Sequence, residues 1–272
     1  MDVQLFFRTE MSRPELHTVA GGQAAVFSRT APGKESANED AAALLTVNQR
    51  AAILVVADGL GGQPAGELAS DLAVRRMIDA IRSGPTDEPS LRGSILNGIE
   101  QANRAIAELG VGAGTTLAVA EIQGRTVRPY HVGDSLIMAV GQRGRLKLQT
   151  VSHSPVGYAV EAGVLDEYEA MHHEDRHVIS NMLGTPDMRI EIGSTVELAP
   201  FDTLLLATDG LFDNLHNAEI IEQVRKSPIE RVARRLVEQC HTRMVDQQPG
   251  LPCKPDDLTF IVFRGARSAP NN

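Results

Sequence analysis

Two apolar runs in this sequence end abruptly in Asp-Gly, and they constrain the fold more than any other feature. AAILVVAD (51–58) precedes Gly59, and TLLLATD (203–209) precedes Gly210. Short apolar runs bounded by glycine are typical of buried β-strands. Asp-Gly after a strand is also a common turn signal, so a turn and a ligand site are both open at each position. The choice depends on whether other carboxylates lie in the same setting.

Further acids do lie beside expected strands: Glu39, Asp40, Asp134, Asp213, Asp256 and Asp257. An acid at the end of a buried strand loses hydration unless a positive group meets it. No Lys or Arg adjoins Asp58, Asp209 or Asp213 in the sequence. Converging acids would repel one another without a cation, and a set of oxygen ligands suits Mg²⁺ or Mn²⁺ better than Zn²⁺.

The order of elements predicts an α+β fold. Strand patterns at 23–30, 40–47 and 50–58 are followed by helical spacing over 64–83 and 90–109. Four strand candidates, an irregular segment, two more strand patterns, helices at 217–226 and 228–246 and a final strand complete the chain. This order suggests antiparallel sheets between helix pairs. We see no linker and expect one domain over 1–272, with 1–20 as a loose arm and 266–272 as a tail.

Charge and composition narrow the partners. The chain of 272 residues carries a net charge of −9, which argues against nucleic acid and acidic membrane surfaces as partners. Its two cysteines form no disulfide framework, and the N-terminus lacks the long apolar core of a signal peptide. We therefore expect a cytoplasmic protein with no nucleic-acid or membrane partner.

Six short motifs in order carry a family resemblance: NED (38–40), DGLGG (58–62), GTT (114–116), GDS (133–135), DGLFD (209–213) and DDLT (256–259). Together they resemble the metal-dependent protein Ser/Thr phosphatases of the protein phosphatase 2C (PPM) family, bacterial type. The resemblance covers about residues 20–265. It implies a four-layer α-β-β-α sandwich, with two antiparallel sheets flanked by helix pairs and a metal site at one sheet edge.

The resemblance also implies a role for each matched acid. Asp58 resembles the acid that bridges two metal ions, and the carbonyl of Gly59 resembles the backbone ligand beside it. Asp209 and Asp256 resemble the acids that complete the shell of the other ion. The implied catalytic residues are Asp58, Asp209, Asp256 and Asp40.

The remaining matched positions have supporting roles in the family. Glu39 and Asp40 resemble acids that hold metal-bound waters. Asp134 and Asp213, together with Asp209, resemble the acids of a third metal site found in bacterial members. Thr115 and Thr116 match a structural stretch, and we assign them no chemistry.

The implied activity is hydrolysis of phosphoserine and phosphothreonine in proteins. Two Mn²⁺ or Mg²⁺ ions, with a third in some members, share a water and lower its pKa, and the resulting hydroxide attacks phosphorus in line. The implied partner is a phosphoprotein substrate of an opposing Ser/Thr kinase. We expect the chain to be a monomer.

The sequence departs from the family pattern at three positions. Many relatives carry a phosphate-binding Arg where this chain has Glu35, so Lys34 and Arg29 become the candidates for binding substrate phosphate. Leu60 stands where some members place a general-acid His. Asp257 stands where Asn is usual in the last motif.

Histidines in the irregular segment raise two further questions. His153 lies where the family has a variable flap near the site, and catalysis and a loop hydrogen bond are both open for it. His172, His173 and His177 fit no common zinc spacing and predict a solvated loop.

Alternative functions remain from the same residues. The altered phosphate position leaves open a catalytically weak or inactive binding module with this fold, and a phosphatase for small phosphoesters is the other alternative. A cysteine phosphatase would need Arg six residues after its cysteine, but Asp246 and Thr259 stand six residues after Cys240 and Cys253.

Overall fold

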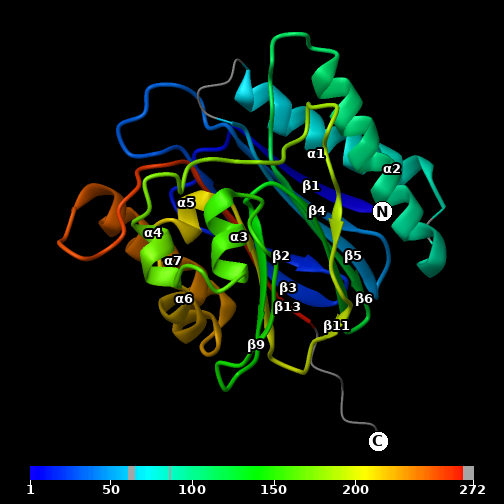
Figure 1. Cartoon of the computed structure of the whole chain (residues 1–272). Helices are drawn as coiled ribbons and strands as arrows, with labels where there is room; N and C mark the ends of the chain where they lie inside the picture. The colour runs from blue at the N-terminus through cyan, green and yellow to red at the C-terminus, as the bar shows by residue number, and fades with distance from the viewer. Residues whose placement is uncertain (61–64, 86, 266–272) are drawn as a thin grey trace, which may run out of the picture.

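The computed structural model describes residues 1–60, 65–85 and 87–265 in four layers (Figure 1). Two antiparallel sheets pack face to face, and helices cover the outer face of each. The predicted four-layer α-β-β-α sandwich is therefore confirmed. The beginning of the helix expected from residue 64 and the expected tail at 266–272 lie outside the described residues.

The first sheet contains the strand that ends in Asp58. Its order is β1-β4-β5-β6-β7-β10, with β11 also paired to β7, and all its pairings are antiparallel. Its strands are β1 (Asp2–Phe7), β4 (Asp40–Thr46), β5 (Ala51–Asp58), β6 (Leu117–Gln123), β7 (Thr126–Val132), β10 (Glu191–Ile192) and β11 (Val196–Glu197).

The second sheet contains the strand that leads to Asp209. Its order is β2-β3-β13-β12-β8-β9, so the last strand along the chain lies between two earlier ones. Its strands are β2 (Glu15–Val19), β3 (Gly22–Arg29), β8 (Leu136–Val140), β9 (Leu146–Gln149), β12 (Thr203–Ala207) and β13 (Leu258–Arg264).

The helices divide between the two outer faces. α1 packs on β4 and β5 and against α2, while α7 packs on β3 and β13 and against α6. None of the helices in the described ranges is both long and apolar enough to cross a membrane. The helices are α1 (Gly66–Ser83), α2 (Glu88–Ala107), α3 (Pro155–Glu161), α4 (Glu167–Met171), α5 (Asp209–Phe212), α6 (Asn217–Val224) and α7 (Ile229–Val245).

Alternate side chains of strand β4 pack into two different hydrophobic cores, one on each face of the sheet. Ala42 and Leu44 pack into the core between the sheets, and Ala43 and Leu45 pack against α1 and α2. Successive side chains of a strand point to opposite faces, so a strand buried on both faces must be apolar at every position. The two acids of β4 and β5 stand where these strands begin or end, Asp40 and Asp58.

The expectation of a loose arm over residues 1–20 is wrong. β1 pairs with β4, and β2 pairs with β3, so each forms the edge of one sheet. Only one side chain in each of these strands is buried, Phe6 and Val19. Edge strands with mixed, half-exposed side chains give a weak sequence signal because their pairing comes from the neighbouring strand.

Candidate metal centre

Four strand ends bring carboxylates to one edge of the sandwich. Asp40 begins β4 and lies directly opposite Asp58, which ends β5, in the register of that antiparallel pair. Asp209 follows β12 at the beginning of α5, and Asp256 lies two residues before β13. Because β12 and β13 are antiparallel neighbours, the end of one lies beside the beginning of the other.

These acids lie close enough together to raise one another's pKa values. Burial raises the pKa of Asp58 well above its usual value, and the charges of Asp40, Asp209, Asp256 and Asp134 raise it further. Burial likewise raises the pKa of Asp40, with help from the neighbouring acids. The structure therefore gathers the predicted acids from both sheets into one centre.

The pKa values of Asp134, Asp213 and Asp256 are shifted in the same direction. Burial, with the charges of Asp209 and Asp213, raises the pKa of Asp134 to about 8. Burial and the charge of Asp209 raise the pKa of Asp256 to about 7. The pKa of Asp213 is raised first by burial and then by Asp209. Carboxyl groups shifted in this way need a cation if they are to be ionised together.

The donor set fits hard divalent cations. Among the described residues, the buried Oδ1 atoms of Asp40, Asp134 and Asp209 have no hydrogen-bond partner. Buried carboxylate oxygens are seldom left unpaired, and each such atom needs a physical explanation. Ions that prefer oxygen ligands, such as Mn²⁺ and Mg²⁺, would supply the missing partner.

Two glycines allow the backbone to close around the centre. A Cβ atom added to Gly59 would collide with the carbonyl of Gly66, and one added to Gly210 would collide with the carbonyl of Asp257. Glycine is required at each position by this close approach, and not by an unusual φ angle. The Asp-Gly pairs are therefore more than simple turns.

Hydroxyl groups hold the backbone of Asp58. The Thr115 hydroxyl donates to the Asp58 carbonyl oxygen at 2.7 Å, and the amide of Asp58 donates to Thr116 Oγ1 at 3.1 Å. Thr116 Oγ1 also lies 2.6 Å from the hydroxyl oxygen of Ser135. The structural assignment of the Gly-Thr-Thr stretch is thus consistent with its contacts.

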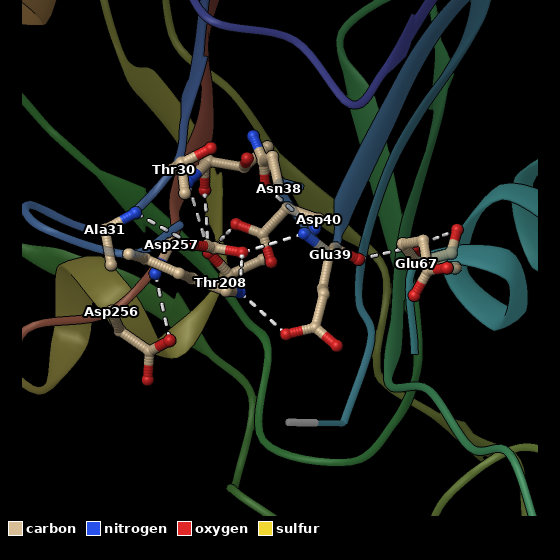
Figure 2. A network of polar contacts seen from close by, with 12 residues as sticks. Thr30, Ala31, Asn38, Glu39, Asp40, Glu67, Thr208, Asp256 and Asp257 are labelled. Atoms are coloured by element: carbon tan, nitrogen blue, oxygen red, sulfur yellow. Dashed lines mark hydrogen bonds and ion pairs between the residues drawn. The ribbon is translucent and has the colours of Figure 1, made fainter. Parts of the chain in front are cut away.

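Asp257 has a role that its sequence position did not reveal. Its carboxylate accepts hydrogen bonds from the amides of Ala31 at 2.8 Å and Glu39 at 2.7 Å (Figure 2). The ammonium of Lys34 lies 2.7 Å from the same carboxylate. The side chain is turned into the 30–39 loop, and it holds the loop that carries Glu39 and Asp40.

Lys34 and Arg29, the two candidates for binding substrate phosphate, differ in how strongly nearby carboxylates neutralise them. Lys34 Nζ contacts Glu39 at 2.6 Å as well as Asp257, so two carboxylates already neutralise it. Arg29 is 49% exposed, and its Nε lies 3.8 Å from the Glu10 carboxylate. Phosphate binding by Lys34 or Arg29 stays a prediction, and Arg29 has the weaker competing contact.

Lys254 was missed in the sequence. Its Nζ contacts the carboxylates of Asp213 at 2.9 Å and Asp256 at 3.2 Å, and it also forms an ion pair with Asp209. Burial alone would lower the pKa of Lys254, but these three carboxylates more than offset burial and raise it. The only sequence signal was a Lys two residues before the last acidic motif.

His153 makes loop contacts. Its Nδ1 accepts hydrogen bonds from the Gly133 amide at 3.1 Å and the Asn181 side chain at 2.8 Å, so the ring proton lies on Nε2, 3.1 Å from Glu191. In the part of the chain that the structure describes, His131, His153 and Glu191 bring ligand atoms within 4.8 Å of one another. The proton on Nε2 disfavours a metal there, and the ring instead holds the Gly133-Asp134 turn.

The other histidines of this segment also make local contacts. His172 Nδ1 lies 2.8 Å from the Tyr168 carbonyl oxygen, and His173 Nδ1 accepts the Asp175 amide at 3.1 Å. Among the described residues, His172, His173 and His177 do not form a metal-ligand group.

Two hollows flank the acid centre. One, of about 360 Å³, is lined by Asp134, Asp209 and Asp213 together with α3, α4 and Arg176. The other, of about 550 Å³, is lined by Asp256 and by the 29–38 segment with Lys34 and Arg29. The centre is thus open to a ligand from two sides.

Comparisons with known proteins agree with this geometry. A family model described as protein phosphatase 2C matches residues 30–248. The serine/threonine phosphatase stp of Listeria innocua is 31% identical over 201 residues, covering 70% of this chain and 78% of that protein. The protein phosphatase PhpP of Streptococcus pneumoniae is 34% identical over 175 residues, covering 62% of this chain and 70% of that protein.

Solved structures show the same fold. The serine/threonine phosphatase Stp1 from Staphylococcus aureus aligns with a TM-score of 0.77 at 26% identity, over 94% of this chain and 97% of that one. The catalytic domain of the phosphatase PstP, in complex with 2 manganese ions, aligns with a TM-score of 0.71 at 25% identity, over 90% and 98% of the two chains.

Proposed function

The chain belongs to the protein phosphatase 2C family, and from that premise we propose that it hydrolyses phosphoserine and phosphothreonine in proteins with manganese or magnesium ions. The observation that carries the proposal is the convergence of buried and half-buried aspartates from separate strands. Their unpaired oxygens and raised pKa values call for cations at that edge.

The proposed shell holds two ions. The aspartates Asp58, Asp209, Asp256 and Asp40 would carry the catalytic chemistry through the ions. The residues that would ligate the ions, directly or through water, are Asp58, Gly59 (by its carbonyl oxygen), Asp209, Asp256, Glu39 and Asp40. The acids Asp134, Asp209 and Asp213 form the outer set next to them.

The protein's own part in the reaction is positioning. When bound, the ions supply the activated water and offset the charge of the phosphate. Thr208 donates to Asp40 Oδ2 at 3.0 Å and so orients that carboxylate, while Thr115 and Thr116 fix Asp58. In hydrolysis the water oxygen bonds to phosphorus, and the serine or threonine oxygen leaves and takes up a proton. Leu60 offers no proton for that step.

The partner is a phosphoprotein. We propose that the two hollows beside the centre receive the residues that flank the phosphorylated side chain. An opposing Ser/Thr kinase, a monomeric state and a cytoplasmic location are further parts of the proposal, carried by the family resemblance and the composition.

Phosphate release from a phosphothreonine peptide, titrated with Mn²⁺, tests the function. Asp209→Asn should lower turnover on the order of 100-fold or more, because metal sites lose that much even when supporting partners are changed. Asp166→Asn, in the exposed N-cap of α4, is the matched control and should retain full activity. Turnover that does not depend on Mn²⁺, or that survives in Asp209→Asn, would contradict the proposal.

A further inference from the structure

The ammonium of Lys254 lies among the outer acids of the centre. It contacts Asp213 at 2.9 Å and Asp256 at 3.2 Å and forms an ion pair with Asp209. Its charge also lowers the pKa of Asp134, against the effect of burial. One cation therefore acts on all three outer acids, Asp134, Asp209 and Asp213, and on two acids of the proposed inner shell, Asp209 and Asp256.

The backbone around Lys254 is built to place this side chain. The Lys254 amide donates to Asn214 Oδ1 at 2.9 Å, and its carbonyl oxygen accepts from Asn214 Nδ2 at 2.8 Å. The same Nδ2, fully buried, also donates to the Gly210 carbonyl oxygen at 2.9 Å. Arg176, between α4 and β10, donates to the Cys253 carbonyl oxygen at 3.2 Å. The lysine is thus fixed to the segment that carries Asp209 and Asp213.

We propose that Lys254 is a built-in third cation, which takes the place of a divalent ion at the outer acids Asp134, Asp209 and Asp213. The inference rests on the proposed function for the two inner ions. A tethered ammonium neutralises one charge where a divalent ion would neutralise two, and it cannot dissociate. Its presence makes the outer site independent of the metal concentration.

Manganese binding to the metal-stripped full chain tests this proposal directly. Isothermal titration calorimetry, with the count checked by native mass spectrometry, should give two ions for the wild type and three for Lys254→Met. Loss of the positive charge should tighten binding at the outer acids at least about tenfold, since one unit charge a few Å away counts for that much at an effective dielectric constant near 20.

Two matched variants separate charge from general disruption. Lys254→Arg keeps a cation at the position and should bind two ions. Lys147→Met removes a partly buried ion pair, Nζ to the Asp202 carboxylate at 2.5 Å, and should also bind two. Asp202 lies at the opposite end of β12 from Asp209. Without metal, Lys254→Met should melt about 5 °C lower than the wild type, because three carboxylates lose their partner, and Mn²⁺ should restore the loss.

The outcomes are distinguishable. Three ions bound to the wild type, or an unchanged count and affinity in Lys254→Met, would overturn the inference and leave the proposed function intact. No manganese bound to the wild type would overturn both. If Lys254→Met does not fold, Lys254→Gln replaces it and should also bind three ions. The number of manganese ions bound by the wild type tests the inference without any variant.

Discussion

Asp40 stands directly opposite Asp58 across the β4–β5 pair, so a buried and a half-buried carboxylate face each other in register. Like charges at opposed positions of a sheet are destabilising. A cation between them would offset this repulsion, and without one the ionised pair makes the centre costly for the metal-free protein.

Asp40→Asn should therefore stabilise the metal-free protein. The variant removes one of the opposed charges, and the Thr208 hydroxyl can still donate to the side-chain oxygen. We expect a gain of about 1–2 kcal/mol at pH 8, seen as a higher melting temperature in EDTA, since a buried charge without a partner is unfavourable. The stabilisation by added Mn²⁺ should shrink.

Asp202→Asn is the control for this prediction. Its carboxylate is buried too, but it accepts the Ala199 amide at 2.7 Å and contacts Lys147 at 2.5 Å. Its loss should cost about 1–2 kcal/mol in EDTA. A lower melting point for Asp40→Asn in EDTA would show that the opposed pair is not repulsive.

Gly59→Ala should destabilise the fold because its new methyl group has no room beside the Gly66 carbonyl. Forced repacking of this kind costs about 1–3 kcal/mol, which urea denaturation would measure. Gly93→Ala in α2 is the matched substitution. Its Cβ would meet nothing within 4 Å, and we expect it to stabilise by about 0.5–1 kcal/mol. Equal effects of the two changes would refute the close-approach argument.

Asp257→Asn should destabilise the 30–39 loop, although it restores the residue usual in the family. An amide nitrogen cannot accept a hydrogen bond, so one of the Ala31 and Glu39 amides loses its acceptor, and Lys34 loses a charge partner. We expect a loss of about 2 kcal/mol and weaker Mn²⁺ binding, measured by thermal melting and calorimetry. Asp166→Asn should change neither, and a silent Asp257→Asn would show that the loop is held in another way.

His131 should make stability fall in acid. The ring is buried and donates from Nε2 to the Val151 carbonyl oxygen at 2.8 Å. Burial, with the neighbouring His153, lowers the pKa of His131 to about 4, below its unfolded value of about 6.5, while Glu191 acts in the opposite direction. The unfolded chain then binds the proton first, so stability is lost as the pH falls from about 6.5 to 4.

His131→Gln keeps the donor and removes the titration. The difference in unfolding free energy between the wild type and this variant should therefore change by up to about 3 kcal/mol between pH 7 and pH 4. Urea denaturation at a series of pH values measures it. A difference that is the same at every pH would mean that His131 does not titrate in this way.

The strands that carry the centre could be predicted because they are buried on both faces. The run 51–58 is continuously apolar for that reason, and its end in Asp-Gly marks the edge of the sheet. The helix pair α1 and α2 was equally readable, since one face of each packs on a core. The apolar residues of each helix recur at helical spacing because they lie on the buried face, and this spacing can be seen in the sequence.

Other parts of the centre could not be predicted because they depend on contacts distant in the sequence. The Asp257 carboxylate accepts a hydrogen bond from the amide of Ala31, 226 residues away in the sequence, and no local sequence pattern predicts this contact. Lys254 lies beside Asp209 only because Asn214 fixes its loop. The strands β1 and β2 could not be predicted from their own residues because each is held by its pairing with a neighbouring strand.

The place of β13 between β3 and β12 sets an order of events during synthesis. Until the ribosome has made and released this strand, β3 and β12 each present an unpaired side, and Asp256 has not joined the acids made earlier. Pairings between segments so far apart in the chain form slowly, and unpaired strands are open to aggregation in the meantime. Before β13 is in place, the chain lacks one acid of the proposed metal shell and could not yet act as a phosphatase.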